Sequence, residues 1–156
     1  FVWGARIHRK KRLAITEDVE NSALIQSIRT QLPPDQAGLP VPELFALVDQ
    51  DLSGGRSFGS IDLGRAWVLI GDQAVLLRNL RGLFLKKRVH TTSKVVSTSF
   101  DVYIYDSTHL IAYIPFARKR TAKQCIEALA AAAPQVQTGG PKEEETFQKQ
   151  LLPNAK

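Results

Sequence analysis

The chain has 156 residues, of which 44% are hydrophobic and 23% charged, a composition typical of a globular domain with its own core. Cys125 is the only cysteine, which excludes an intrachain disulfide and a zinc site built from several cysteines. No apolar run reaches the roughly 18 residues that a membrane-spanning helix needs, so no segment of this sequence is predicted to cross a bilayer.

The net charge of +6 is unevenly distributed along the chain. Residues 1–12 carry +5, residues 13–62 carry −6, residues 63–140 carry +7, and the remainder is balanced. Such asymmetry favours anionic partners, but a charged surface that only keeps the protein in solution explains it equally well.

The first twelve residues have the pattern found where a membrane span ends. An apolar segment with Trp3 leads into a cluster of five cations. These cations are Arg6, Arg9, Lys10, Lys11 and Arg12. Since the chain starts at Phe1 rather than Met, we expect an anchoring segment to precede it. Residues 1–12 are then a juxtamembrane stub that contacts anionic lipid at the cytoplasmic face, and a basic linker is the alternative.

Two helices are predicted before the strands begin. The first has Thr16 as its cap and apolar residues at helical spacing up to Leu32, where a pair of prolines ends it. The second follows another group of prolines and runs from Glu43 to about Asp51. Residues 56–64 are expected to form a loop with a short extended piece.

Short β-type runs dominate the middle of the chain. Trp67–Ile70 and Ala74–Leu77 flank Gly71-Asp72-Gln73, which predicts a hairpin. A third strand is predicted from Leu83 to about Val89, and a polar turn over residues 91–94 follows it.

A fourth strand, over residues 99–105, is rich in aromatic and β-branched side chains. Alternation places Phe100, Val102 and Ile104 on one of its faces, and Tyr103 and Tyr105 on the other. The last strand is predicted over residues 109–114, and a proline directly after it ends the strand or marks an edge.

A final helix is predicted from Ala122 to about Ala133, with Thr121 as its cap. The whole pattern indicates a single α+β domain over residues 13–134, with an antiparallel sheet, a C-terminal helix across it and N-terminal helices beside it. Residues 135–156 are predicted to be a polar, partly disordered tail, in which Phe147 is one of few apolar residues able to dock.

The search for chemical motifs is negative, so no catalytic residue, cofactor or metal site is predicted. No phosphate-binding glycine motif is present, and His8, His90 and His109 lack the spacing of metal ligands. Cys125 lies three residues into the amphipathic last helix, which favours a small packed side chain over a nucleophile.

Two basic clusters in the strand block are the one positive signal for a binding site. The candidate anion-binding residues are Lys86, Lys87, Arg88, Arg118, Lys119, Arg120 and Lys123. If both clusters meet at one rim of the sheet, they are suited to bind phosphate groups. Simple solvation of exposed cations is the alternative.

The order of these elements resembles bacterial pleckstrin-homology-like domains. The resemblance rests on Trp67–Ile70, Gly71-Asp72, Ala74–Leu77, Leu83–Leu85, Phe100–Asp106, His109–Ile114 and the helix Thr121–Pro134. It implies a strongly bent sheet closed by one helix over about residues 60–134, and it extends to uncharacterised bacterial proteins that carry such a domain on a membrane anchor. The basic lipid-binding loop of the eukaryotic relatives is absent at Gly71-Asp72-Gln73, so inositol-phosphate recognition is not implied.

The function predicted from these features is a non-enzymatic, membrane-proximal interaction module. Its expected partners are an anionic membrane surface and a further protein, and no small-molecule substrate is identified. A nucleic-acid-binding domain that uses the basic strand block is one alternative, with tyrosines as stacking groups. An enzyme without a recognisable motif is the other.

Overall fold

The computed structural model describes residues 22–151, which form an α+β fold with two four-stranded sheets. The α+β class predicted from the sequence is confirmed. We expected one domain over residues 13–134, but the chain divides into two compact units, the first ending at Leu77 and the second beginning at Arg78. This boundary falls at the short 3-10 helix η2 (Leu77–Asn79), where the sequence has no proline- or glycine-rich linker to mark it.

Within the described residues, three helices precede the first sheet: α2 (Ala23–Arg29), α3 (Pro34–Ala37) and α4 (Val41–Leu52). Ser22 caps α2, because its Oγ accepts a hydrogen bond from the backbone N–H of Ile25 at 3.3 Å. Helix α2 ends at Arg29, earlier than the predicted end at Leu32. The predicted cap at Thr16 lies outside the described residues. The second predicted helix is confirmed as α4, which starts directly after Pro40.

Four short antiparallel strands form the first sheet in the order β1-β2-β3-β4. They are β1 (Arg56–Phe58), β2 (Ile61–Leu63), β3 (Trp67–Ile70) and β4 (Gln73–Leu76). The β3–β4 hairpin confirms the prediction, and Gly71 takes a φ of +62° at its turn. The expected loop over residues 56–64 is wrong, since β1 and β2 form a second tight hairpin. Three-residue strands are too short to give an alternating pattern in the sequence.

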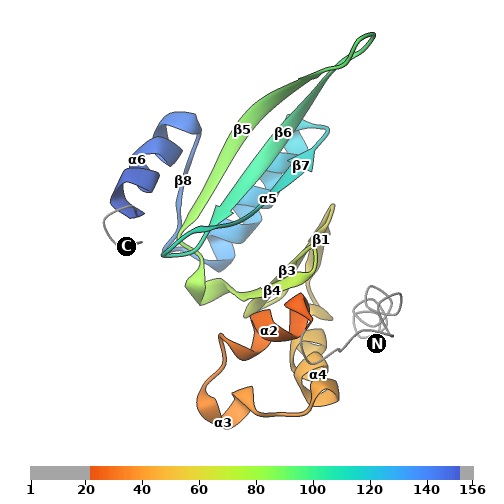
Figure 1. The fold of residues 1–156 in the computed structure, drawn as a ribbon, viewed down its shortest axis with the longest axis vertical. Helices are drawn as coiled ribbons and strands as arrows, with labels where there is room; N and C mark the ends of the chain where they lie inside the picture. Colours follow the sequence, from red (N-terminus) through yellow and green to blue (C-terminus); the bar gives the residue numbers. More distant parts are fainter. Residues whose placement is uncertain (1–21, 152–156) are drawn as a thin grey trace. The chain divides into compact units, whose positions relative to one another are not determined.

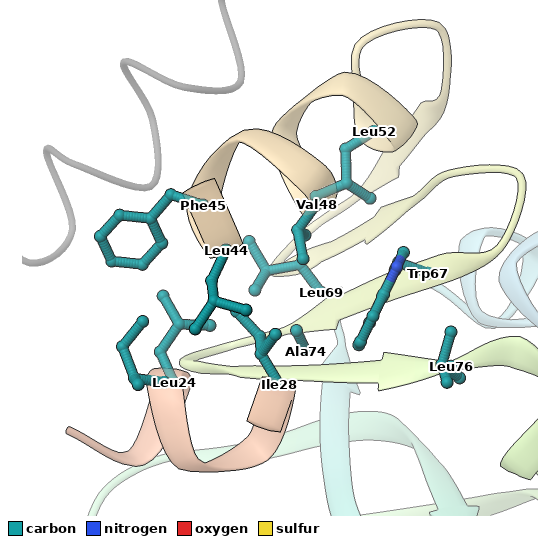
Figure 2. Packing of buried hydrophobic residues seen from close by; sticks show 11 residues of the cluster. Leu24, Ile28, Leu44, Phe45, Val48, Leu52, Trp67, Leu69, Ala74 and Leu76 are labelled. Atoms are coloured by element: carbon teal, nitrogen blue, oxygen red, sulfur yellow. The ribbon is translucent and has the colours of Figure 1, made fainter. Parts of the chain in front are cut away.

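Helices α2 and α4 pack on one face of this sheet (Figure 2). Because side chains alternate along a strand, Trp67 and Leu69 of β3 share that face with Ala74 and Leu76 of β4. The buried cluster consists of Leu24, Ile25, Ile28, Leu44, Phe45, Val48, Leu52, Trp67, Leu69, Ala74 and Leu76. Removal of these side chains from water holds the helices on the sheet.

Polar side chains of α2 and of the residues directly after it cover the outer edge of β4. The Gln31 amide donates to the carbonyl oxygen of Ala74 at 2.7 Å and accepts from the N–H of Leu76 at 2.7 Å. The Oγ of Ser27 accepts from the N–H of Ala74 at 3.1 Å. These bonds satisfy backbone groups that a further strand would otherwise use, so the edge is closed to additional pairing.

The second sheet has the order β7-β6-β5-β8 (Figure 1). Its strands are β5 (Gly82–Thr91), β6 (Val96–Tyr105), β7 (Leu110–Phe116) and β8 (Gln137–Gly139). The first three are antiparallel neighbours, and β8 pairs in parallel with the start of β5. The predicted strands are confirmed, and Pro115 lies in the edge strand β7. Strands β5 and β6 both extend further toward their shared turn than predicted.

Helix α5 (Lys119–Ala132) contacts β5, β6 and β7 and lies behind them in Figure 1. Its buried side chains are Ala122, Cys125 and Leu129, which face the side of the sheet that carries Leu83, Val102 and Ile104. The predicted packed role of Cys125 is confirmed. The predicted cap at Thr121 is wrong, because the helix begins at Lys119, three residues before the predicted start, and follows Arg118 without a side-chain cap.

Residues 135–156 were expected to form a partly disordered tail, but most of this segment is ordered. Strand β8 is followed by α6 (Pro141–Leu151), and the buried ring of Phe147 lies 5.3 Å from Phe84 and 5.2 Å from Tyr105 between ring centroids. Gly82 makes room for this ring, since a Cβ there would lie 3.1 Å from its Cζ atom. Backbone pairing through β8 and the buried Phe147 ring both connect this polar segment to the sheet.

Candidate anion-binding surface

The register of the second sheet brings the two basic clusters to one end of this unit. Lys87 of β5 lies opposite Phe100 of β6, which in turn lies opposite Phe116 at the end of β7. The chain then enters α5 within three residues. The cations at the start of α5 therefore stand at the same level along the sheet as the cluster on β5.

The distal part of the β5–β6 hairpin, residues 86–99, projects from this end, and we call it the arm. Strand β8 pairs only with residues 82–84 of β5, and β7 pairs with β6 only from Phe100 onward. Most of the arm is thus a two-stranded ribbon, and Figure 1 shows it reaching past the end of β7. The sequence contains no Asp or Glu from Lys86 to Phe100, so the arm carries cations alone.

Alternation along β5 separates the three cations of the first cluster. Lys86 and Arg88 share one face of the sheet with Phe84, and Lys87 belongs to the opposite face, which carries α5. The sequence predicts these three residues as one basic cluster. In the structure they lie on two faces of the sheet, so their side chains contact different groups.

Arg88 is engaged by groups of its own sheet. Its Nε lies 3.2 Å from Oδ2 of Asp101, its NH2 group donates to the Tyr103 hydroxyl at 2.8 Å, and its guanidinium lies 4.8 Å from the centroid of the Tyr113 ring. Tyr103 and Tyr113 are themselves stacked, with centroids 5.2 Å apart. Since Asp101 is only 1% exposed, Arg88 is needed to balance a buried carboxylate.

Lys86 is engaged by helix α6. Its Nζ lies 2.8 Å from Oε1 of Glu144 and 3.9 Å from the centroid of the Tyr103 ring. The other carboxylate oxygen of Glu144 accepts from the Tyr105 hydroxyl at 2.7 Å, and Gln148 donates to that hydroxyl at 2.8 Å. Burial and the bond to Glu144 raise the pKa of Tyr105 to about 12. Lys86 thus anchors α6 to the sheet.

His90, Ser99 and Asp101 form a short chain of hydrogen bonds on the same face. Ser99 Oγ donates to Oδ1 of Asp101 at 2.7 Å and lies 2.8 Å from His90 Nε2. A nucleophilic serine donates its proton to a histidine that an acid orients from the other side. Here the serine lies between the other two and gives its proton to the acid, so the arrangement supports the sheet rather than acyl transfer.

The other cations of the two predicted clusters, and Lys94 in the turn of the arm, are exposed to solvent. Within residues 22–151 none of them forms an ion pair, and the first turn of α5 contains no acid. We call this set the basic end, and it consists of Lys87, Lys94, Arg118, Lys119, Arg120 and Lys123. Cations at a helix start are opposed by the helix dipole, so an external anion would stabilise this arrangement. Lys94, in the turn of the arm, was not identified from the sequence.

Other candidate residues have structural roles or lie elsewhere. The stub residues Arg6, Arg9, Lys10, Lys11 and Arg12 fall outside the described part of the chain. Burial raises the pKa of the Cys125 thiol to about 12, which leaves it protonated at neutral pH and unsuited to nucleophilic attack. His109 is exposed and lies 3.2 Å from Asp106 through its Nδ1 atom.

A surface hollow of about 480 Å³ lies in the first unit, lined by residues of the α4 end and by Arg65. Its acid, Asp51, accepts hydrogen bonds from the backbone N–H groups of Ala66 and Trp67 at 2.8–3.0 Å. This carboxylate therefore fixes the start of β3 to the end of α4, which gives it a structural role.

No group of three or more His, Cys, Asp or Glu side chains within residues 22–151 is arranged to hold a metal ion. None of the helices in this described part is long and apolar enough to cross a membrane.

Comparison of the chain with protein-family models, with characterised proteins and with solved structures gave no match.

Proposed function

We propose that the chain is a non-enzymatic, membrane-proximal interaction module whose second unit presents the basic end to an anionic surface. The observation that carries this proposal is that five exposed cations, from β5 and from the start of α5, lie at one end of one unit, and that Lys94 lies at the tip of the arm that projects from this end. An uncompensated cluster of this kind attracts phosphate groups and other anions over a Debye length. The stub of residues 1–12 adds five cations from the same chain.

The membrane is the favoured anionic surface because of the stub sequence. Trp3 followed by a basic cluster is typical of a segment at the cytoplasmic face of a bilayer. Each Lys or Arg held near such a surface contributes about 1 kcal/mol, so the stub and the basic end together would give stable binding. A protein bound at the same membrane is the further partner in this proposal.

We extend the proposal to the kind of fold. The run from β3 to α5 keeps the element order of bacterial pleckstrin-homology-like domains, with several antiparallel strands followed by one helix. In this chain the strands belong to two sheets, and β8 and α6 follow the helix. The relation to that family is therefore proposed from element order alone.

Binding to vesicles tests the function. The whole chain is expected to co-sediment with vesicles of phosphatidylcholine and phosphatidylserine at low salt and to be released as salt rises. A version without residues 1–12 should bind more weakly, and equal binding of both versions would remove the stub from the proposal.

Charge reversal at the basic end provides the second arm of this experiment. Arg120→Glu with Lys123→Glu is expected to weaken vesicle binding at least about tenfold, since two contributing cations are lost. The matched control is Arg56→Glu with Arg65→Glu, which makes the same charge change on exposed arginines of the first unit. An equal loss in both variants would show that only net charge matters and would overturn the role of the basic end.

A further inference from the structure

The arm has two chemically different faces. On the face shared with α5, Val89 lies opposite Thr98 and Val96 lies opposite Thr91. On the other face, Arg88 lies opposite Ser99 and His90 lies opposite Ser97. The alternation that buries apolar residues under α5 thus continues along the arm beyond the start of that helix.

The apolar side chains of the arm are exposed to water. Val89, Val95 and Val96 have 56%, 60% and 68% of their surface exposed, the highest values among the large hydrophobic side chains of the described residues. Helix α5 begins at the level of Phe116, which lies opposite Phe100, so it does not extend over the ribbon that carries the valines. An exposed aliphatic group of this kind at the end of a projecting hairpin indicates a contact surface.

The charged residues near the valines indicate which kind of partner surface the valines contact. Lys94 adjoins Val95 in the turn, Lys87 precedes Val89 on the same face, and the cations of α5 lie at the base of the arm. No acidic residue lies in the arm to repel an anionic partner. Aliphatic side chains surrounded by cations match the boundary between acyl chains and anionic headgroups.

We propose that the tip of the arm inserts into the headgroup region of an anionic membrane, with Val89, Val95 and Val96 as the apolar contact and the basic end on the phosphates. This inference rests on the proposed function and names the element of the chain that enters the bilayer. It adds shallow insertion to what would otherwise be purely electrostatic attraction.

A nucleic acid fits the same end less well. Single strands bind where exposed aromatic rings accept stacked bases beside cations. Two tyrosines of this sheet, Tyr103 and Tyr113, are stacked on each other and contacted by Lys86 and Arg88. They also lie on the face opposite to Val89 and Val96, and valine offers no ring for stacking.

Substitution of the valines is the first test, on the whole chain with vesicles of phosphatidylcholine and phosphatidylserine. Val89→Asp with Val96→Asp is expected to weaken binding at least about tenfold, because apolar contact is lost and two negative charges are added. Val89→Ser with Val96→Ser should weaken it about threefold or more without any change of charge. Leu47→Asp is the control, since Leu47 is an exposed side chain of α4 in the first unit.

A fluorescent reporter provides a second readout that depends on insertion rather than on affinity. Val95→Cys is labelled with an environment-sensitive fluorophore, and Leu47→Cys is the matched control. Cys125 is buried with a raised pKa, so the native fold directs labelling to the introduced thiol. Emission at position 95 should shift to shorter wavelength on anionic vesicles, and emission at position 47 should not shift.

The outcomes of these experiments distinguish electrostatic binding by the basic end from insertion of the arm tip. If the wild-type chain binds anionic vesicles but the serine variant binds equally well and the label at position 95 does not shift, insertion is overturned and the electrostatic function remains. If the wild-type chain does not bind at low salt, both proposals fail. A salt-dependent gel shift with a single-stranded oligonucleotide in the absence of vesicle binding would assign the basic end to nucleic acid instead.

Discussion

The two units of this chain differ in the partners of several of their polar side chains. In the first unit, Asp51 and Gln31 bind backbone groups of β3 and β4, which closes the sheet edge and joins helix to strand. In the second unit, Arg88 of β5 pairs with Asp101 of β6, Lys86 of β5 pairs with Glu144 of α6, and the basic end faces solvent. The polar contacts described for the first unit are internal, and the second unit carries the exposed cations to which we assign the proposed function.

The largest effect on stability is expected from the aromatic core of the second unit. Phe84 is fully buried between Tyr105 and Phe147, so Phe84→Ala should lower the free energy of unfolding by about 3–5 kcal/mol. Val89→Ala on the exposed arm should change it by less than about 0.5 kcal/mol. Urea unfolding followed by circular dichroism measures both, and similar losses would contradict the assignment of the arm as a free surface.

The next effect concerns the anchor of α6. Glu144→Ala removes the partner of Lys86 and the acceptor of the Tyr105 hydroxyl. Because the side chain of Lys86 is 30% exposed and can regain water, we expect a loss of about 2 kcal/mol rather than the full cost of a buried charge. Hydrogen exchange of the α6 amides measures this locally. Unchanged exchange would show that Phe147 alone holds the helix.

The covered edge of the first sheet gives a smaller effect. Gln31→Ala removes two hydrogen bonds to β4 and should cost about 1–2 kcal/mol. It also opens an edge to pairing with other chains, so the variant should self-associate more readily than the wild type. Analytical ultracentrifugation tests this. A stable monomer would indicate that the edge needs no cover.

The last effect is a pH dependence that arises from Cys125, and over the tested range from about pH 8 to pH 10 it amounts to about 1.4 kcal/mol. Burial raises the pKa of its thiol in the folded state from the ordinary value of 9.0 to about 12. The unfolded chain ionises first, so stability present below pH 9 is lost as pH rises toward 12, by about 1.4 kcal/mol for each unit in that window. Cys125→Ala should lose less stability than the wild type between about pH 8 and pH 10. Parallel losses in thermal melts would contradict this cause.

The sequence was most informative where strands are regular and buried. Alternation identified both faces of β6, and the proline pattern located the start of α4. It did not identify β1 and β2, which are too short for a pattern, or the division at Leu77, which depends on which strands pair. The ordered tail was missed because Phe147 and Glu144 find partners on β5 and β6 that are distant in sequence.

The candidate site was predicted only in part for a related reason. The cations can be identified in the sequence, but their contacts cannot. The pair Arg88–Asp101 depends on strand register, and the pair Lys86–Glu144 depends on the docking of α6. Val89 was predicted at the end of a strand, and Val95 and Val96 fall between the predicted turn over residues 91–94 and the predicted strand over residues 99–105. Nothing local in the sequence shows that α5 begins too late to cover these valines. Strand alternation followed beyond Lys87 was the one available signal.

Hydrogen exchange of the whole chain with and without anionic vesicles compares the two units most directly. If the second unit makes the membrane contact, amides of residues 87–98 and of the start of α5 should be protected when vesicles are added. Amides of α2, α4 and β1–β4 in the first unit should exchange as before. Protection confined to the first unit, or no protection within residues 22–151 under conditions of full binding, would contradict the proposed function of the basic end.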